Sequence, residues 1–329
     1  MKTCTKCFMP ESRPRITFNE EGVCNACQWS EKKKSIDWRV RTKQFEWITQ
    51  HNGIKEVLVP WSGGKDSIYV AYKMRELGLN PTLITVLPHM ETSIGQWNRI
   101  NTCKDFTKVE INLEEKKYRS LAKKYFIEQG RPKHPWECAI SASVINYAYK
   151  NNFKLIMYGE EGEAEYGGST SQLEKWAEPV DKEYLMKYYW QGSLDWEIPD
   201  DLSDIFFTQW SRFENWSPSK HGNFAVAKGM RCGGRNIGTF TIESQLSDKL
   251  QDLHCYLMYL KFGFGRCTSD VSIAIREGWM DKVEGGELID AYDGEFPMKY
   301  VDEYLDYFNM TSDEFFAVLG KFEEKGETV

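Results

Sequence analysis

The sequence predicts an α/β fold with a doubly wound parallel sheet, preceded by a four-cysteine ribbon and followed by a mostly helical region. Three observations support this prediction. Between residues 55 and 160, short apolar runs alternate with runs of helical periodicity, and this alternation favours a parallel sheet with helices on both faces. A Gly-Gly turn joins the first apolar run to the first helical run. Two C-x₂-C pairs precede both runs.

The composition is that of a large globular chain, and it disfavours some classes of function. The chain has 329 residues, 12 Trp, 17 Tyr, 18 Phe and a net charge of −7. This acidic balance gives the chain as a whole no electrostatic reason to coat nucleic acid. The sequence shows neither a signal peptide nor an apolar run long enough to span a bilayer. We therefore expect a cytoplasmic protein without a membrane partner.

Four cysteines near the start of the chain predict a metal site. Cys4 and Cys7 form one C-x₂-C pair, Cys24 and Cys27 form another, and residues 8–23 lie between them. Four thiolates at this spacing suit a closed, tetrahedral structural Zn²⁺. A redox C-x₂-C or an iron–sulfur cluster is the less favoured alternative. Because the ribbon has few apolar residues, we expect the metal to supply most of its folding free energy.

The pattern divides the chain into four parts. We expect a zinc ribbon at 1–30, a helical connector at 31–54, an α/β domain at 55–180, and at 181–329 an aromatic-rich substrate region with a helical C-terminal part. Periodicity predicts strands at 56–59, 81–87, 109–113 and 155–158, and helices at 65–77, 115–129, 137–151 and 246–260. Ligands of such sheets bind beyond the carboxyl ends of the strands. The segments after residues 59 and 158 are therefore expected to line one site.

The stretch PWSGGKDS at residues 60–67 has the features of a phosphate-binding turn. It joins a strand to a helix N-terminus, where backbone N–H groups and the helix dipole favour an anion. Its glycines allow close approach, its hydroxyls and lysine are donors, and its aspartate suits a Mg²⁺ that bridges to phosphate. The alternative is an ordinary strand-to-helix turn. We expect ligand contacts from Ser62, Gly63, Gly64, Lys65, Asp66 and Ser67.

A second loop, GEEGEAEYGG at residues 159–168, places four carboxylates among four glycines directly after a strand. Like charges this close are costly unless a cation binds them. A solvated acidic loop is the alternative, but the position at a strand end favours a role in binding Mg²⁺ and nucleotide. We expect this loop, with Gly159, Glu160 and Glu163 among its candidate residues, to bind Mg²⁺ and nucleotide.

Residues 184–240 are irregular in pattern and very aromatic. Exposed aromatic faces beside polar side chains suit sugar rings, whereas buried ones pack a core. We expect most of these aromatic residues to be buried. We expect a minority, near Trp210, Trp216 and His221, to contact substrate.

The helix expected at 246–260 is followed by KFGFGR at residues 261–266. This tight turn presents a guanidinium, and Lys261 and Arg266 together can neutralise an anionic leaving group. A helix C-cap with a solvent-exposed arginine is the alternative.

Both loops resemble motifs of the N-type ATP pyrophosphatases. Residues 62–67 are similar to their S-G-G-x-D-S pyrophosphate loop and unlike the Walker loop. Residues 159–168 are similar to the G-E-G-A-D-E-x-F-G-G motif of asparagine synthetase, with Glu163 in the place of the metal-binding Asp and with departures at Glu161 and Ala164. GMP synthetase, NAD synthetase and several tRNA-modifying enzymes belong to the same superfamily. The resemblance implies an adenine nucleotide alpha hydrolase-like (PP-loop) fold, ATP and Mg²⁺ as cofactors, and cleavage of ATP between its α and β phosphates.

The whole set of motifs resembles the N-acetyl sugar amidotransferases of surface-polysaccharide biosynthesis (WbpG/PseA type). The set includes the cysteine ribbon, both loops, residues 261–266, IREG at 275–278 and YDG at 292–294. The resemblance implies conversion of an acetamido group of an N-acetyl sugar or nonulosonic acid to acetamidino, with release of AMP and pyrophosphate. The glycan would belong to lipopolysaccharide, capsule or flagellin. The implied catalytic residues are Lys65, Asp66, Glu163, Lys261 and Arg266.

The source of ammonia is not evident in the sequence. No Cys follows Met1 directly, and no G-x-C-x-G nucleophile elbow is present, so we expect free ammonia or delivery by a partner. The family resemblance implies a glutaminase and a cyclase-like subunit as partners.

Two other functions compete with this one. A tRNA-modifying thiolase of the same superfamily also combines zinc ribbons with an S-G-G-x-D-S loop, but the acidic net charge disfavours it. A non-catalytic ATP-binding scaffold is disfavoured by the presence of Lys65, Asp66 and Glu163.

Overall fold

The computed structural model describes residues 2–160, 162–168, 178–179, 181–186 and 198–326. Within these residues, six strands form one sheet in the order β3-β2-β1-β4-β6-β5. Neighbours from β3 to β6 are parallel, and β5 pairs antiparallel with β6 at the edge. The strands are β1 (Glu56–Pro60), β2 (Asn80–Val86), β3 (Thr107–Ile111), β4 (Leu155–Tyr158), β5 (Glu178–Pro179) and β6 (Phe206–Gln209). The predicted parallel sheet is confirmed.

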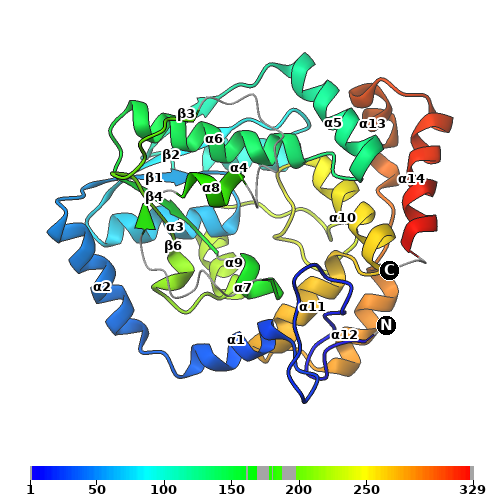
Figure 1. Cartoon of the computed structure of the whole chain (residues 1–329), viewed down its shortest axis with the longest axis horizontal. Helices are drawn as coiled ribbons and strands as arrows, with labels where there is room; N and C mark the ends of the chain where they lie inside the picture. Colours follow the sequence, from blue (N-terminus) through cyan, green and yellow to red (C-terminus); the bar gives the residue numbers. More distant parts are fainter. Residues whose placement is uncertain (1, 161, 169–177, 180, 187–197, 327–329) are drawn as a thin grey trace.

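Helices cover both faces of this sheet (Figure 1). Val57 and Val59 of β1 face a core shared with α2, α3 and α9, whereas Leu58 faces a core shared with α6. Alternate residues of a strand point to opposite faces, so a strand covered on both sides is apolar throughout. The helices named here are α2 (Trp38–His51), α3 (Lys65–Glu76), α6 (His134–Lys150) and α9 (Pro218–Ala227).

The strand order reverses at β1, which lies between β2 and β4. In doubly wound sheets this reversal opens a crevice at the carboxyl ends of the two diverging strands. Strand β1 continues through residues 61–64 into α3, and β4 continues into the short helix α7 (Gly162–Tyr166). Leu58 pairs with Ile156 across the two strands. The two loops expected to line one site are thus adjacent.

The C-terminal region is mostly helical, as predicted, and packs against α5 (Glu115–Gln129). Phe126 of α5 stacks on Phe308, with ring centroids 4.9 Å apart, and Phe315 lies against both rings. This core holds α10 in place. The helices involved are α10 (Lys249–Phe262), α13 (Val301–Phe308) and α14 (Ser312–Gly326), and Met298–Tyr300 form a 3₁₀ turn.

The cysteine ribbon packs between α1 (Asn25–Lys34) and two C-terminal helices, α11 (Arg266–Glu277) and α12 (Lys282–Tyr292) (Figure 1). Phe264 is buried among the cysteines, and the backbone N–H of Phe8 donates to the Ser272 hydroxyl at 3.2 Å. The first and last thirds of the sequence therefore lie side by side. No helix in the described ranges combines the length and apolar character needed to cross a membrane.

The expectation of an irregular, partly substrate-exposed region at 184–240 is corrected in two ways. Residues 206–209 form strand β6, paired in register with β4, because the pairing rather than a local pattern defines this short strand. Trp210 is fully buried and Trp216 is 2% exposed, both in the core beneath α3. Neither lines the polar cavity described below. Part of this region, residues 187–197, lies outside the described residues.

The short elements of the chain not yet named are α4 (Ser93–Asn101), α8 (Lys182–Tyr184) and a 3₁₀ turn at Trp210–Arg212.

Candidate active site

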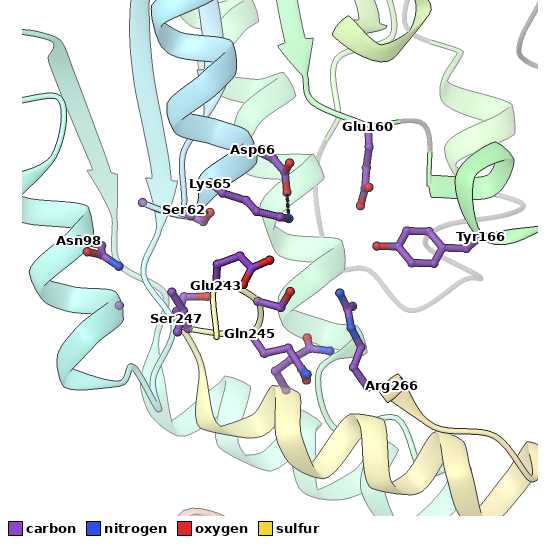
Figure 2. Close-up of a pocket in the computed structure, with 16 residues that line it drawn as sticks. Ser62, Lys65, Asp66, Asn98, Glu160, Tyr166, Glu243, Gln245, Ser247 and Arg266 are labelled. Carbon is purple, nitrogen blue, oxygen red and sulfur yellow. Dashed lines mark hydrogen bonds and ion pairs between the residues drawn. The ribbon is translucent and has the colours of Figure 1, made fainter. Parts of the chain in front are cut away.

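A polar cavity of about 240 Å³ lies at the carboxyl ends of β1 and β4. The loops after these strands form one wall, and the segment before α10 and the start of α11 form the other (Figure 2). Lys65, Glu160, Tyr166 and Arg266 point into the same space. The structure thus brings together seven of the residues predicted from sequence: Ser62, Gly63, Gly64, Lys65, Asp66, Glu160 and Arg266.

The loop after β1 is held in a tight turn that leaves the N-terminus of α3 open. Gly63 has φ +75°, and a Cβ there would lie 2.6 Å from the backbone nitrogen of Arg99, so only glycine fits. Gly64 occupies the N-cap position, and it has no side chain to occupy the first N–H groups of α3. Ser62 accepts from the Gly64 N–H at 3.2 Å, and Ser67 donates to the Gly64 carbonyl at 3.0 Å. Ser67 therefore stabilises the turn and does not line the cavity.

Lys65 and Asp66 form the charged centre of the cavity. The Lys65 Nζ lies 2.6 Å from Asp66 Oδ2, and His221 Nδ1 lies 3.2 Å from Asp66 Oδ1. Burial alone would raise the pKa of Asp66, but the Lys65 charge and the His221 hydrogen bond lower it to about 2. Asp66 is thus ionised throughout the physiological range.

Glu160 supplies a second carboxylate on the same wall of the cavity as Asp66 (Figure 2). Burial, and then the charge of Asp66, raises the pKa of Glu160 to about 7. Two carboxylates that disfavour each other's ionisation are a donor set that a divalent cation would stabilise. Asp66 and Glu160 therefore fit Mg²⁺. The tyrosine ring of Tyr166 lies beside them and its hydroxyl is directed into the cavity.

Arg266 faces the cavity from the first turn of α11 and is not free in solvent. Its Nη2 lies 2.8 Å from Asp270 Oδ1 and its Nε lies 3.0 Å from Asp270 Oδ2. Thr239 in turn donates to Asp270 Oδ2 at 2.7 Å. These two hydrogen bonds fix the plane of the guanidinium. The positive charge of Arg266 therefore has a defined position at the cavity wall.

Lys261 was expected beside Arg266, but the structure places it elsewhere. Helix α10 continues to Phe262, so Lys261 is still helical and its side chain leaves on another side. Its Nζ donates to the carbonyls of Gln129 and Gly130 at 3.1 and 3.2 Å, at the end of α5. Burial lowers the pKa of Lys261 to about 8. The side chain joins two helices and does not line the cavity.

Glu163 was expected to hold Mg²⁺, but its carboxylate forms an ion pair with Arg15 of the ribbon. Helix α7 directs Glu163 and Glu165 towards the ribbon, whereas Glu160, before the helix, faces the cavity. Glu161, another departure from the motif, lies outside the described residues. The acidic loop therefore divides its carboxylates between two neighbours, and Glu160 replaces Glu163 as the metal candidate.

Gly159, expected to contact nucleotide, also has a structural reason to be glycine. A Cβ at this position would lie 2.8 Å from the ring of Trp216 and 3.6 Å from the Cβ of Asp66. The end of β4 at Gly159 thus packs between the ring of Trp216 and the loop that carries Asp66. Gly159 does not line the cavity, and its place beside Asp66 makes it part of the packing behind the loop.

Sequence reasoning missed the opposite wall of the cavity. This wall comes from the polar run before α10, in which Gln245 has φ +53°, an unusual value for a residue with a side chain. The thiol of Cys255 donates to Gln245 Oε1 at 3.1 Å and accepts from Gln251 Nε2 at 3.2 Å, which orients both amides. The only sequence signal was this polar run before the helix-capping Asp248. The cavity residues not predicted individually are Glu243, Ser244, Gln245, Leu246, Ser247 and Gln251 on this wall, Gly95 and Asn98 in α4, and Tyr166 at the end of α7.

A second cavity of about 230 Å³ adjoins the first, and Ser62 and Ser247 line both. It is mainly apolar, and Trp61, Ile84 and Trp136 are among its walls. An apolar space next to a turn suited to phosphate would accept a heterocyclic base. The two cavities together thus provide room for a nucleotide at the ends of β1 and β2.

The four ribbon cysteines form a candidate metal centre. All four are buried, and their Sγ atoms lie within 4.8 Å of one another. Cys4 Sγ lies 3.8 Å from Cys27 Sγ, and Cys7 Sγ lies 3.7 Å from Cys24 Sγ. A tetrahedral Zn²⁺ with bonds of about 2.3 Å to sulfur separates its ligands by nearly this distance. The residues therefore fit a closed structural zinc site.

The site thus combines an open helix N-terminus after a Gly-Gly turn, two carboxylates and a fixed arginine at the switch point of a doubly wound sheet. Residues 210–327 match the family model described as the LPS biosynthesis protein WbpG-like, C-terminal domain. This match confirms the resemblance to the WbpG type and includes the helix that carries Arg266.

Solved structures give weaker likenesses. The predicted subunit of a tRNA methyltransferase from Methanocaldococcus jannaschii is 17% identical, with a TM-score of 0.32, over 52% of this chain and 75% of that chain. The NH₃-dependent NAD synthetase from Campylobacter jejuni, in complex with nitrate, is 14% identical, with a TM-score of 0.35, over 89% of this chain and 96% of that chain. Scores this low add no argument about function. No curated protein matches the chain.

Proposed function

We propose that the chain is an AMP-forming amidotransferase that converts the acetamido group of an N-acetyl sugar or nonulosonic acid to an acetamidino group. One observation carries the proposal: the phosphate-binding turn, Lys65, Asp66, Glu160 and Arg266 converge on one polar cavity, in a chain with a WbpG-like C-terminal domain. The adjoining apolar cavity would take the adenine. The polar cavity would take the triphosphate and the acetamido group.

The chemistry needs positioning and charge stabilisation more than a protein nucleophile. An amide oxygen leaves poorly, so it first attacks the α-phosphorus of ATP and pyrophosphate departs. Ammonia then attacks the amide carbon, and AMP leaves with the former amide oxygen. The turn before α3 would hold the phosphates, and Lys65 and Arg266 would stabilise the charge on the departing pyrophosphate. Mg²⁺ held by Asp66 and Glu160 would neutralise phosphate charge.

The proposal extends to the pathway and the partners. The family name and the resemblance support a role in a surface glycan such as lipopolysaccharide, capsule or a flagellin glycan. We propose that a glutaminase and a cyclase-like subunit deliver the ammonia. Adding glutamine with these subunits should support turnover at ammonium concentrations that do not support it alone.

Mass spectrometry of the reaction products tests the function. The protein is incubated with ATP, Mg²⁺, ammonium and a panel of acetamido sugars. We expect a sugar product lighter by the difference between O and NH, formed together with AMP and pyrophosphate. AMP formation that requires tRNA would instead indicate a thiolase, and no AMP with any substrate would contradict the proposal.

A further inference from the structure

His221 is a buried polar residue behind the proposed ATP site. It lies in α9, its side chain is 0% exposed, and it does not line the cavity. Its ring stacks on Tyr69 of α3, with centroids 4.0 Å apart, and meets the edge of Trp216 at 4.1 Å. An imidazole in such surroundings costs desolvation free energy unless its polar atoms find partners.

The partner that His221 finds is the Asp66 carboxylate, at 3.2 Å. A carboxylate oxygen can only accept here, so Nδ1 carries the hydrogen and donates to Oδ1. Among the described residues, Nε2 has no hydrogen-bond partner. The hydrogen bond to Asp66 is therefore the imidazole's only hydrogen bond within the described residues.

Two packed helices hold this hydrogen bond in place. Ser217 caps α9, and Phe224 of α9 packs edge-on against Tyr69 and Tyr72 of α3. Asp66 lies in the first turn of α3, with Lys65 bound to its other oxygen. The carboxylate is thus fixed from both sides. Its orientation towards the cavity does not depend on a ligand.

We propose that His221 is a positioning residue that orients the Asp66 carboxylate to hold the Mg²⁺ of MgATP. This inference rests on the proposed function, because it assumes that Asp66 binds the metal–nucleotide. Residues that hydrogen-bond a metal-ligating carboxylate orient it and increase its affinity for the metal. His221 acts through Asp66 and does not touch the nucleotide.

Two substitutions separate the hydrogen bond from the packing. In His221→Asn the amide nitrogen is as many bonds from Cα as Nδ1, so the donor is kept. In His221→Leu the donor is lost. Both variants lose the stack on Tyr69, so their difference reports the hydrogen bond. Thermal unfolding of both shows whether they fold alike.

The measurement is Mn²⁺ binding by electron paramagnetic resonance in the presence of α,β-methylene-ATP, with Mn²⁺ replacing Mg²⁺. We expect His221→Leu to weaken Mn²⁺ binding about 10-fold or more and His221→Asn to stay near the wild type. In an Asp66→Asn background, His221→Leu should have no further effect. If His221→Leu is too unstable, His221→Gln, whose amide is displaced by one bond, replaces it in both the wild-type and the Asp66→Asn backgrounds.

The outcomes separate this inference from the proposed function. If the wild type binds Mn²⁺ and nucleotide but His221→Leu binds them equally well, the positioning role is wrong and the function stands. If both His221→Asn and His221→Leu bind weakly to the same extent, packing rather than the hydrogen bond is responsible, and the proposal fails. If the wild type binds no metal–nucleotide, both proposals fail.

Discussion

At the scale of single residues, chemistry at the cavity depends on carboxylates whose surroundings differ. Asp66 accepts from Lys65 and His221, Glu160 lies on the same wall of the cavity as Asp66, and Glu163 pairs with Arg15. From the sequence motif, all carboxylates of the loop at residues 159–168 were expected to serve one binding site. The structure assigns its members to different neighbours, because Glu160 precedes α7 and lines the cavity, whereas Glu163 lies within the helix and pairs with Arg15.

Replacing the three carboxylates by their amides tests this assignment. Asp66→Asn should reduce AMP formation about 100-fold or more, because a charge that holds the metal–phosphate complex is lost. Glu160→Gln should act in the same direction. Glu163→Gln is the matched control and should retain most activity, since its ion pair with Arg15 is half exposed on the arginine side. The check is the rate of AMP release at saturating ATP, and full activity of Asp66→Asn would contradict the assignment.

Lys261 in the last turn of α10 and Arg266 at the start of α11 give a second test at this scale. Arg266 faces the cavity, whereas Lys261 binds carbonyls at the end of α5. Arg266→Met should lower kcat about 100-fold, since the cation on the leaving pyrophosphate is lost. Lys261→Met should leave kcat nearly unchanged and lower the midpoint of thermal unfolding. Equal losses of kcat in both variants would restore the role that the sequence predicted for Lys261.

At the scale of elements, the ribbon and its helix α1 hold the loop that carries Glu160 and Tyr166. Lys33 Nζ lies 2.8 Å from Glu165 Oε2, with side chains 11% and 12% exposed, and Trp29 Nε1 donates to Glu165 Oε1 at 3.1 Å. Asn25 Nδ2 donates to the Gly168 carbonyl at 2.6 Å. These contacts hold the C-terminal end of α7, and the ion pair between Arg15 and Glu163 lies near its start, so the ribbon and α1 set the position of one wall of the cavity.

Two neighbouring lysines of α1 test this coupling. Lys33→Met removes a buried partner of Glu165 and should lower the free energy of unfolding by roughly 2 kcal/mol. It should also raise the KM for ATP, while zinc content stays unchanged. Lys34→Met is the control: its ion pair with Glu31 is exposed and should contribute less than about 1 kcal/mol. Equal KM values for the two variants would show that the ribbon does not position the loop.

Local patterns account for what could be predicted at this scale. A few neighbouring residues are enough to predict each of these features: strands β1 to β4, the turn at Gly63 and Gly64, and the four cysteines. Strand β6 and the buried position of Trp210 are not, because β6 is defined by pairing with β4 and Trp210 by packing on Phe45. The far wall of the cavity and the hydrogen bond from His221 depend on segments more than a hundred residues from Asp66.

At the scale of the whole molecule, the four-cysteine cluster connects the start of the chain to the helix that carries Arg266. Arg276 of α11 donates to Cys7 Sγ at 3.7 Å and to the Glu165 carbonyl at 2.7 Å. The ribbon therefore contacts both walls of the cavity, through α7 and through α11. Loss of a metal bound by the four cysteines should therefore weaken ATP binding at the cavity.

Removing zinc tests this long-range connection. A variant with Cys4→Ser and Cys24→Ser should lose its zinc, unfold at a lower temperature and bind ATP more weakly than the wild type. The checks are metal analysis, thermal unfolding and ATP titration on the same preparation. Zinc content equal to that of the wild type would contradict the metal assignment. Lost zinc with unchanged ATP affinity would contradict the coupling.

The central claim is that the acetamido oxygen attacks ATP, and an isotope label tests it most directly. An acetamido substrate labelled with ¹⁸O at its carbonyl is converted in the presence of ATP, Mg²⁺ and ammonium, and the released nucleotide is examined by mass spectrometry. The account predicts that the label appears in AMP, because the amide oxygen leaves on the α-phosphorus. Turnover with unlabelled AMP, or with the label in inorganic phosphate, would contradict it.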